Sequence, residues 1–129
     1  MKNTILLVDD EPEILKMLSK AFGLKGYNIL QADSGEEGLQ VLSKNHCLVM
    51  FLDLNLPGIN GLELCHIIKT ELPVAICYAV TGHSSMFELA DCREAGFDDY
   101  FTKPAKMETL FTAAETAFEK LIRWQVIHP

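Results

Sequence analysis

The stretch "VMFLDLNLPGING", residues 49–61, places an aspartate directly after a run of apolar residues and continues into a turn-rich segment. The apolar run begins at residue 47 and predicts a strand that is covered on both faces of a sheet. The stretch "TILLVDD", residues 4–10, repeats this pattern and ends in two acidic residues. Two buried strands that both end in acid indicate that the chemistry of this protein lies at the ends of its strands.

Outward from these two stretches, apolar runs alternate with segments whose apolar residues recur at helical spacing. The expected strands are 4–8, 27–32, 47–53, 73–81 and 97–102. The expected helices are 12–26, 35–45, 61–72, 83–96 and 107–124. Ser34 followed by Glu37 matches a capping box before the second helix, and Gly26 and Gly96 mark helix ends. The alternation predicts a doubly wound parallel sheet of flavodoxin-like α/β type, with strand order 2-1-3-4-5.

The composition favours one soluble domain. The chain has 129 residues, of which 49% are hydrophobic and 22% charged. Its longest apolar run is too short to cross a bilayer, and its first ten residues lack the features of a signal peptide, so we expect a cytoplasmic protein without membrane insertion. The formal net charge of −7 argues against direct nucleic-acid binding, which needs a basic face, but it is compatible with binding a cation.

The four cysteines are widely spaced and include no C-x-x-C motif. We expect free, mostly buried thiols in a reducing compartment. The alternative, a metal cluster that includes histidines, has no ligand spacing to support it. His66 and His83, which such a cluster could use, are expected on the surfaces of helices instead.

Polar residues end four of the five predicted strands. In a doubly wound sheet, ligands bind beyond the carboxyl ends of the strands, where strands 1 and 3 meet. Clustered carboxylates there would repel one another, and Mg²⁺ together with a lysine would stabilise them. An aspartate in such a site can attack phosphorus and form an acyl phosphate. The residues expected to converge are Asp9, Asp10, Asp53, Thr81 and Lys103.

Four motifs resemble the receiver domain of two-component response regulators, in the order and spacing of that family. They are "VDD" (8–10), "DLNLPGINGLEL" (53–64), "TGHSS" (81–85) and "DYFTKP" (99–104). The similarity covers nearly the whole chain and includes stand-alone receivers of the chemotaxis and sporulation types. It implies a receiver domain at 1–123. Residues 124–129 are then either a frayed helix end or the start of a linker.

The resemblance implies a phospho-accepting signalling switch, with self-catalysed aspartyl phosphorylation and dephosphorylation but no separate substrate turnover. Asp53 would take a phosphoryl group from the phosphohistidine of a sensor histidine kinase or of a histidine phosphotransfer protein. Mg²⁺ or Mn²⁺ would be held by Asp10, Asp53 and the main-chain carbonyl of Asn55, with Asp9 acting through a water. Lys103 would pair with Asp53 and then with the phosphoryl oxygens.

The resemblance also implies a conformational response. The hydroxyl of Thr81 would swing toward the phosphoryl group, and Tyr100 would move from an outward to an inward position. The changed surface of the fourth helix, fifth strand and fifth helix would then bind an unknown output protein or domain. The bond before Pro104 would be cis, a form that proline permits at modest cost. Asn60 departs from the family pattern, which often has aspartate there.

Ordinary structural roles and other functions compete with this interpretation. Asp10 alone would serve as the cap of the first helix, with Glu13 as its partner. A phosphatase with an aspartyl nucleophile usually has a second acid at the position of Asn55. A flavin-binding electron carrier would have its phosphate repelled by "DDEPE". A receiver that acts only as a scaffold would fail to react with acetyl phosphate and Mg²⁺.

Overall fold

The computed structural model describes residues 3–82 and 86–129. Its strands are β1 (Thr4–Val8), β2 (Asn28–Ala32), β3 (Val49–Leu52), β4 (Ile76–Thr81) and β5 (Asp99–Thr102). Its helices are α1 (Pro12–Leu24), α2 (Gly35–Lys44), α3 (Gly61–Glu71), α4 (Met86–Ala95) and α5 (Met107–Arg123). The strands form one parallel sheet in the order β2-β1-β3-β4-β5, which confirms the predicted fold.

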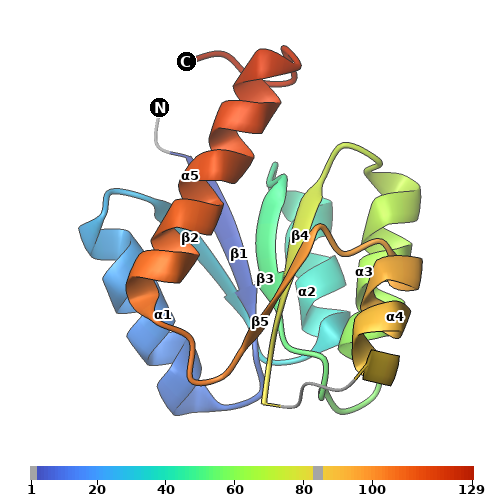
Figure 1. Cartoon of the computed structure of the whole chain (residues 1–129). Coiled ribbons are helices and arrows are strands. Elements are labelled where there is room, and N and C mark those ends of the chain that lie inside the picture. Colours follow the sequence, from blue (N-terminus) through green and yellow to red (C-terminus); the bar gives the residue numbers. More distant parts are fainter. Residues whose placement is uncertain (1–2, 83–85) are drawn as a thin grey trace.

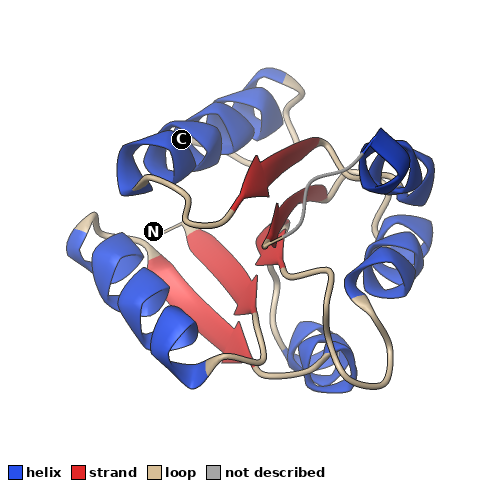
Figure 2. Cartoon of the chain, turned by 60° about the horizontal axis from the view of Figure 1, so that its bottom comes forward, coloured by secondary structure: helices blue, strands red, loops and turns tan. Residues whose placement is uncertain are grey.

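The helices cover both faces of this sheet. α1 and α5 lie on one face, and α2, α3 and α4 lie on the other (Figures 1 and 2). All strands run in the same direction, so their carboxyl ends share one edge, which comes forward in Figure 2. The strand order changes direction between β1 and β3, and this switch point places the loops after both strands beside each other.

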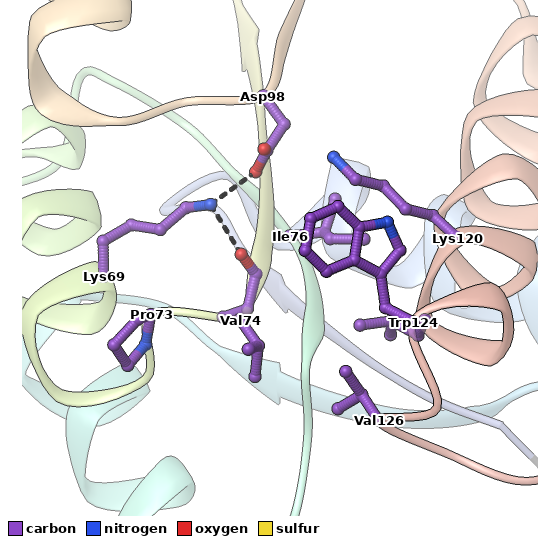
Figure 3. Close-up of a pocket in the computed structure, with 10 residues that line it drawn as sticks. Lys69, Pro73, Val74, Ile76, Asp98, Lys120, Trp124 and Val126 are labelled. Carbon is purple, nitrogen blue, oxygen red and sulfur yellow. Dashed lines mark hydrogen bonds and ion pairs between the residues drawn. The ribbon is translucent and has the colours of Figure 1, made fainter.

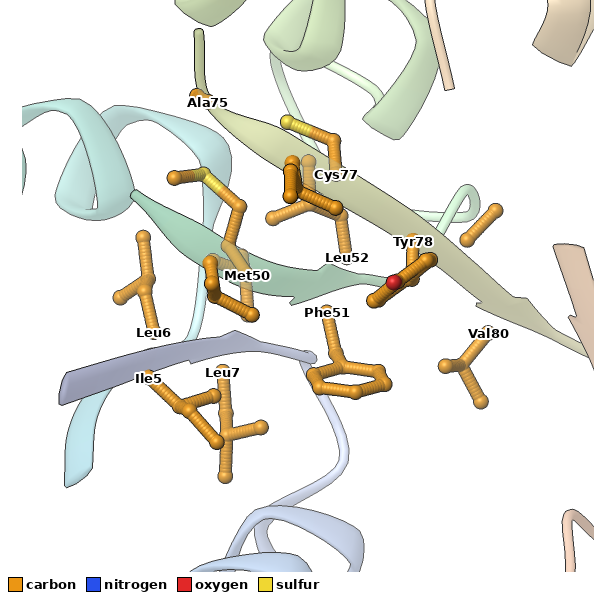
Figure 4. Close-up of a cluster of buried hydrophobic side chains, with 14 of the residues drawn as sticks. Ile5, Leu6, Leu7, Met50, Phe51, Leu52, Ala75, Cys77, Tyr78 and Val80 are labelled. Atoms are coloured by element: carbon orange, nitrogen blue, oxygen red, sulfur yellow. The ribbon is translucent and has the colours of Figure 1, made fainter. Parts of the chain in front are cut away.

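The core is built around the three central strands, β1, β3 and β4, whose side chains after Thr4 are buried on both faces (Figure 4). Aromatic residues of β3 and β4 contact the helices α1 and α5. The ring of Phe51 lies 5.3 Å from that of Phe22 on α1 and 5.2 Å from that of Tyr78, measured between centroids. The hydroxyl of Tyr78 donates a hydrogen bond of 3.0 Å to the carbonyl of Ala113 on α5.

Replacing Tyr78 by Phe is expected to lower the free energy of unfolding by about 1 kcal/mol, the usual net worth of one such hydrogen bond. Urea denaturation measures the change. Tyr27→Phe is the matched control, because the Tyr27 ring stacks on Phe118 while its hydroxyl has no hydrogen-bond partner among the described residues. An equal loss in both variants would show that the bond to Ala113 contributes nothing specific.

Four strands begin later in the chain than the apolar runs predicted, β2 by one residue and the other three by two or three, and those boundaries were wrong. β3 begins at Val49 rather than at residue 47, and β5 at Asp99 rather than at 97. β4 begins at Ile76, whose N–H donates to the carbonyl of Leu48 at 2.7 Å, whereas Ala75 just before it closes a turn. A strand starts where a neighbouring backbone is available, and an apolar run alone does not reveal that point.

The capping prediction for the second helix is confirmed. Ser34 accepts a hydrogen bond from the N–H of Glu37 at 3.1 Å. The carboxylate of Glu37 accepts in return from the N–H of Asp33, one residue before the cap. The first helix ends at Leu24, two residues before Gly26, whose φ of +96° is the left-handed conformation that follows many helix ends. The predicted start of the fourth helix at residue 83 lies outside the described residues.

The chain stays attached to the domain beyond α5, so this helix end is closed rather than frayed. Gln125 adopts a left-handed φ of 58°, and its N–H donates to the carbonyl of Ile122. The N–H of Val126 donates to the carbonyl of Leu121 at 2.9 Å, which completes a Schellman motif. Val126 and Ile127 pack against the core. The boundary after residue 123 stays a prediction.

The cysteines are free and buried, as predicted, at Cys47, Cys65, Cys77 and Cys92. They come from the segment before β3, from α3, from β4 and from α4. Within the described part of the chain, no helix combines the length and apolar character that crossing a membrane requires.

Candidate functional site

The buried polar side chains gather at the carboxyl edge of the sheet. Among the described residues, the buried polar or charged ones are Asp9, Asp53 and Thr81, with exposed fractions of 4%, 4% and 0%. Asp9 follows β1, Asp53 follows β3, and Thr81 ends β4. Burying charge without a partner is costly, so a fold that concentrates its buried polar groups at one edge marks that edge as a site.

Lys103, just after β5, holds the acidic side chains together. Its ammonium nitrogen lies 2.7 Å from Asp9 Oδ2, 3.3 Å from Asp53 Oδ2 and 3.4 Å from Glu11 Oε1. Its backbone N–H donates to the carbonyl of Thr81 at 2.8 Å, which fixes the segment against β4. The expected pairing with Asp53 is therefore shared with Asp9, which lies closer. The bond between Lys103 and Pro104 is cis, as expected.

The loop after β1 is organised by Asp9 and not by a cap at Asp10. The N-cap of α1 is Glu11, Pro12 follows it, and no side chain makes the capping hydrogen bond. Asp9 Oδ1 instead accepts from the N–H of Glu11 at 2.9 Å. The interpretation of Asp10 as a capping residue was therefore wrong, and its exposed carboxylate has no capping role to fulfil.

The surroundings of Asp53 do not fully balance the negative charge of its carboxylate. Burial and the nearby charge of Asp9 raise the pKa of Asp53, and the opposing effects of Lys103 and of the Asn55 N–H do not cancel this rise. Burial by itself lowers the pKa of Lys103, but its hydrogen bonds and charge interactions with Asp9 and Asp53 outweigh it and raise that pKa overall. The site therefore keeps a charged lysine and favours a further cation.

The acidic cluster suits a divalent cation. Asp9, Asp10, Glu11 and Asp53 each offer a carboxylate oxygen, and these four atoms lie within 4.8 Å of one another. No other group of three or more such residues in the described part of the chain is arranged in this way. Mg²⁺ and Mn²⁺ prefer oxygen ligands, and two exposed members leave room for water. The N–H of Asn55 donates to Asp53 Oδ1 at 3.2 Å, and the role of its carbonyl stays a prediction.

Thr81 and Tyr100 occupy the neighbouring strands β4 and β5. Within the described part of the chain, the fully buried hydroxyl of Thr81 has no hydrogen-bond partner. Such a group is costly unless a ligand satisfies it. The hydroxyl of Tyr100 lies 3.4 Å from Glu88 Oε2 on α4, and burial together with Glu88 raises its pKa to about 12. His83 lies outside the described residues, and His66 is exposed on α3, as expected.

A backbone hydrogen bond connects the loop after Asp53 to the start of α3. The N–H of Gly61 donates to the carbonyl of Leu54 at 3.0 Å. Asn60 caps the helix by accepting from the N–H of Glu63 at 2.9 Å. Asparagine is among the best N-cap residues, so the departure from the family pattern at Asn60 has a structural role here.

Glu11 is the member of the site that the sequence interpretation missed. It enters the site because it stands at the N-cap of α1 and its side chain reaches Lys103. The available signal was its place directly after two acidic residues of the same loop.

A known protein family matches most of this chain. The model of the family "Response regulator receiver domain" matches residues 5–115. A cyclic di-GMP phosphodiesterase of Thermotoga maritima is 33% identical over 83% of this chain and 28% of its own length. An uncharacterised transcriptional regulatory protein, YrkP, of Bacillus subtilis is 36% identical over 85% of this chain and 47% of its own length. The chain thus spans less than half of these relatives.

Solved structures agree with the sequence comparison. The CheY-like receiver domain protein from Methanospirillum hungatei is 28% identical and superimposes with a TM-score of 0.86, covering 92% of this chain and 96% of its own. Together with the match to the family model, this likeness shows that the chain belongs to the response regulator receiver domain family.

Proposed function

We propose that this chain is a phospho-accepting switch of a two-component system and that Asp53 is the residue that takes the phosphoryl group. The observation that carries this proposal is that the buried polar side chains of the described part, Asp9, Asp53 and Thr81, lie at one edge of the sheet, where the ammonium of Lys103 contacts both carboxylates. A hydrophobic core is stable without buried carboxylates and an ammonium group, whereas a site that accepts a phosphoryl group uses them.

The proposed transfer uses a carboxylate oxygen of Asp53 as the nucleophile. This oxygen forms a bond to phosphorus while the N–P bond of a phosphohistidine breaks. The bonding electron pair stays on the imidazole nitrogen, and Asp53 becomes an acyl phosphate. Lys103 lies within 3.3 Å of Asp53 and is placed to stabilise negative charge on the phosphoryl oxygens. The donor is a sensor histidine kinase or a histidine phosphotransfer protein.

The residues present fit a divalent cation. Asp10, Asp53 and the carbonyl of Asn55 would hold Mg²⁺ or Mn²⁺, with Asp9 acting through a water and Glu11 at the rim of the cluster. When bound, such a cation neutralises charge on the phosphoryl oxygens. Asp9 and Lys103 orient the cluster, because their 2.7 Å contact anchors it between the ends of β1 and β5.

Phosphorylation would act as a switch through Thr81 and Tyr100. A phosphoryl oxygen would satisfy the buried hydroxyl of Thr81, which has no partner among the described residues. Tyr100 connects β5 to α4 through Glu88, so a change near Thr81 can alter the surface formed by α4, β5 and α5. This surface would bind an output protein or domain in the cytoplasm. The partner is not nucleic acid, because the formal charge of −7 disfavours direct binding to phosphates.

Acetyl phosphate with Mg²⁺ is expected to add one phosphoryl group to the wild-type chain, because the cluster needs a cation to accept further negative charge. Intact mass spectrometry measures the addition, and excess EDTA should prevent it. Release of the group by hydroxylamine would identify an acyl phosphate. A second reaction with a phosphorylated histidine kinase tests the proposed donor. Equal labelling in EDTA, or none with Mg²⁺, would contradict the proposal.

A further inference from the structure

A pocket of about 200 Å³ lies at the amino edge of the sheet, at the opposite end of β4 from Thr81. It is bounded by the end of α3 and the segment that leads into β4, by the residue before β5, and by the end of α5. Figure 3 shows Trp124 and Lys120 approaching from α5, and Lys69, Pro73 and Val74 from the opposite side. None of these residues belongs to the cluster around Asp53.

The walls of this pocket expose apolar side chains to solvent. Trp124 is 73% exposed and Val74 is 49% exposed, and they are two of the five large hydrophobic side chains that are exposed in the described part of the chain. They come from segments that are distant in sequence and meet at one opening. The buried side chains of Ile76 and Leu121 also line it, and the hydrogen bonds that close α5 position the backbone of Trp124.

The lining carries a net positive charge in an acidic protein. Lys69 is already satisfied, because its ammonium lies 2.7 Å from Asp98 Oδ2 and 2.6 Å from the carbonyl of Ala75. Lys120 has no ion pair with any described residue. Two lysines against one aspartate give this lining a charge of +1, whereas the whole chain carries −7. The pocket is therefore complementary to an anion.

The volume limits what the pocket can hold. An engineered protein cavity of about 150 Å³ accepts benzene, whereas pockets for drug-sized ligands occupy about 300–1,000 Å³. A pocket of about 200 Å³ fits one six-membered ring with a short polar substituent. An aromatic ring suits these walls because it can pack against the indole of Trp124 as well as against the aliphatic side chains.

We propose that this pocket binds a small aromatic carboxylate, with the ring between Trp124 and Val74 and the carboxylate at the ammonium of Lys120. The binding joins an apolar contact to an ion pair, and neither alone would select this class of ligand. The site is separate from Asp53, so it does not depend on the proposed phosphoryl transfer.

Titration of the ¹⁵N-labelled full chain with phenylacetate tests this proposal by NMR. The chain has one tryptophan, so the single indole N–H signal reports directly on the pocket. We expect saturable shifts of this signal and of the amides around Val74 and Lys120. The dissociation constant should be on the order of 1 mM, as expected for a ligand of this size.

Two comparisons assign the contributions. Lys120→Met should weaken binding about fivefold, the upper range for an exposed ion pair, and the neutral phenylacetamide should bind the wild type more weakly by a similar factor. Lys44→Met, which removes an exposed lysine from the last turn of α2, should leave the titration unchanged. Spectra of both variants outside the pocket should match the wild type, which shows that they fold.

Three results would overturn the proposal. The first is the absence of saturable shifts around the pocket at the highest phenylacetate concentration. The second is equal binding of phenylacetamide, or an equal effect of Lys44→Met and Lys120→Met, because either removes the selection for an anion at Lys120. The third is a shift of the same signals when the protein alone is diluted, since a second copy of the chain would then fill the pocket.

Discussion

Asn in place of Asp53 is expected to abolish phosphoryl uptake from acetyl phosphate while making the metal-free protein more stable. The amide of Asn cannot replace the carboxylate as a nucleophile that ends as an acyl phosphate, so labelling should fall from one group per chain to none. The fold should persist, because Asn has the same shape and Lys103 keeps its 2.7 Å contact with Asp9.

The gain in stability follows from the raised pKa of Asp53. Burial makes the largest contribution to this rise, and the charge of Asp9 makes the second largest. A carboxyl group with a higher pKa in the folded state binds its proton more tightly there than in the unfolded chain. Stability from this group is therefore present at pH below its ordinary pKa of 3.8 and is lost as the pH rises from there through the folded value. At neutral pH the charged Asp53 destabilises the fold.

Asp53→Asn should accordingly raise the free energy of unfolding at neutral pH by roughly 1 kcal/mol, or about 4 °C in Tm. The difference from the wild type should shrink as the pH is lowered through the raised folded pKa of Asp53, because the wild-type carboxyl group then takes up its proton. Thermal denaturation followed by circular dichroism, in the presence of EDTA, measures both effects.

Asp91→Asn is the matched control, because Asp91 is exposed on α4 and lies outside the acidic cluster. It should be labelled like the wild type and show an unchanged Tm. Labelling of Asp53→Asn to the wild-type level would assign the acceptor role to another carboxylate, with Asp10 the first candidate.

Gly61→Ala is expected to destabilise the domain by about 3 kcal/mol or more, the upper end of the cost of overpacking. A Cβ atom at this position would lie 2.6 Å from Leu54 Cα and 2.9 Å from the carbonyl carbon of Asp53. Both are backbone atoms, so no side chain can rotate away to make room. The loop that holds Asp53 must shift instead, and phosphoryl uptake should fall together with stability.

Gly23→Ala provides the same substitution without the clash. Gly23 lies in α1, and no atom outside its immediate surroundings in the helix approaches within 4 Å of the added Cβ. Alanine favours helix more than glycine does, so this variant should gain about 0.5–1 kcal/mol. Urea denaturation of both variants measures the contrast. A Gly61→Ala protein that is as stable as the wild type would show that the loop tolerates displacement.

Local sequence patterns were sufficient to predict the fold and the convergence of Asp9, Asp53 and Lys103 at one edge of the sheet. The apolar runs that end in Asp9 and Asp53 gave two adjacent strands of the sheet, and the strand order then followed from the rules for parallel crossovers. The capping of α2 by Ser34 depends on residues three positions apart, so it could also be predicted.

Features that depend on distant parts of the chain could not be predicted in this way. The start of β4 is set by the hydrogen bond of Ile76 with Leu48, a partner far away in sequence. The closer approach of Lys103 to Asp9 than to Asp53 depends on how three loops pack, as does the entry of Glu11 into the site. The pocket beside Trp124 is lined by the end of α5 and the amino end of β4, which are distant in sequence.

The burial of every cysteine has a consequence for handling and oxidation of the protein. Burial raises the pKa of Cys47 and Cys92 to about 11, and the pKa of Cys77, which lies beside Cys65, is also raised. At neutral pH the reactive thiolates of Cys47, Cys77 and Cys92 are therefore scarce. Because all four cysteines are also buried, the native chain should resist alkylating reagents and peroxide. Modification would require a transient opening of the structure, so the rate at which each cysteine reacts would report the free energy of that local opening.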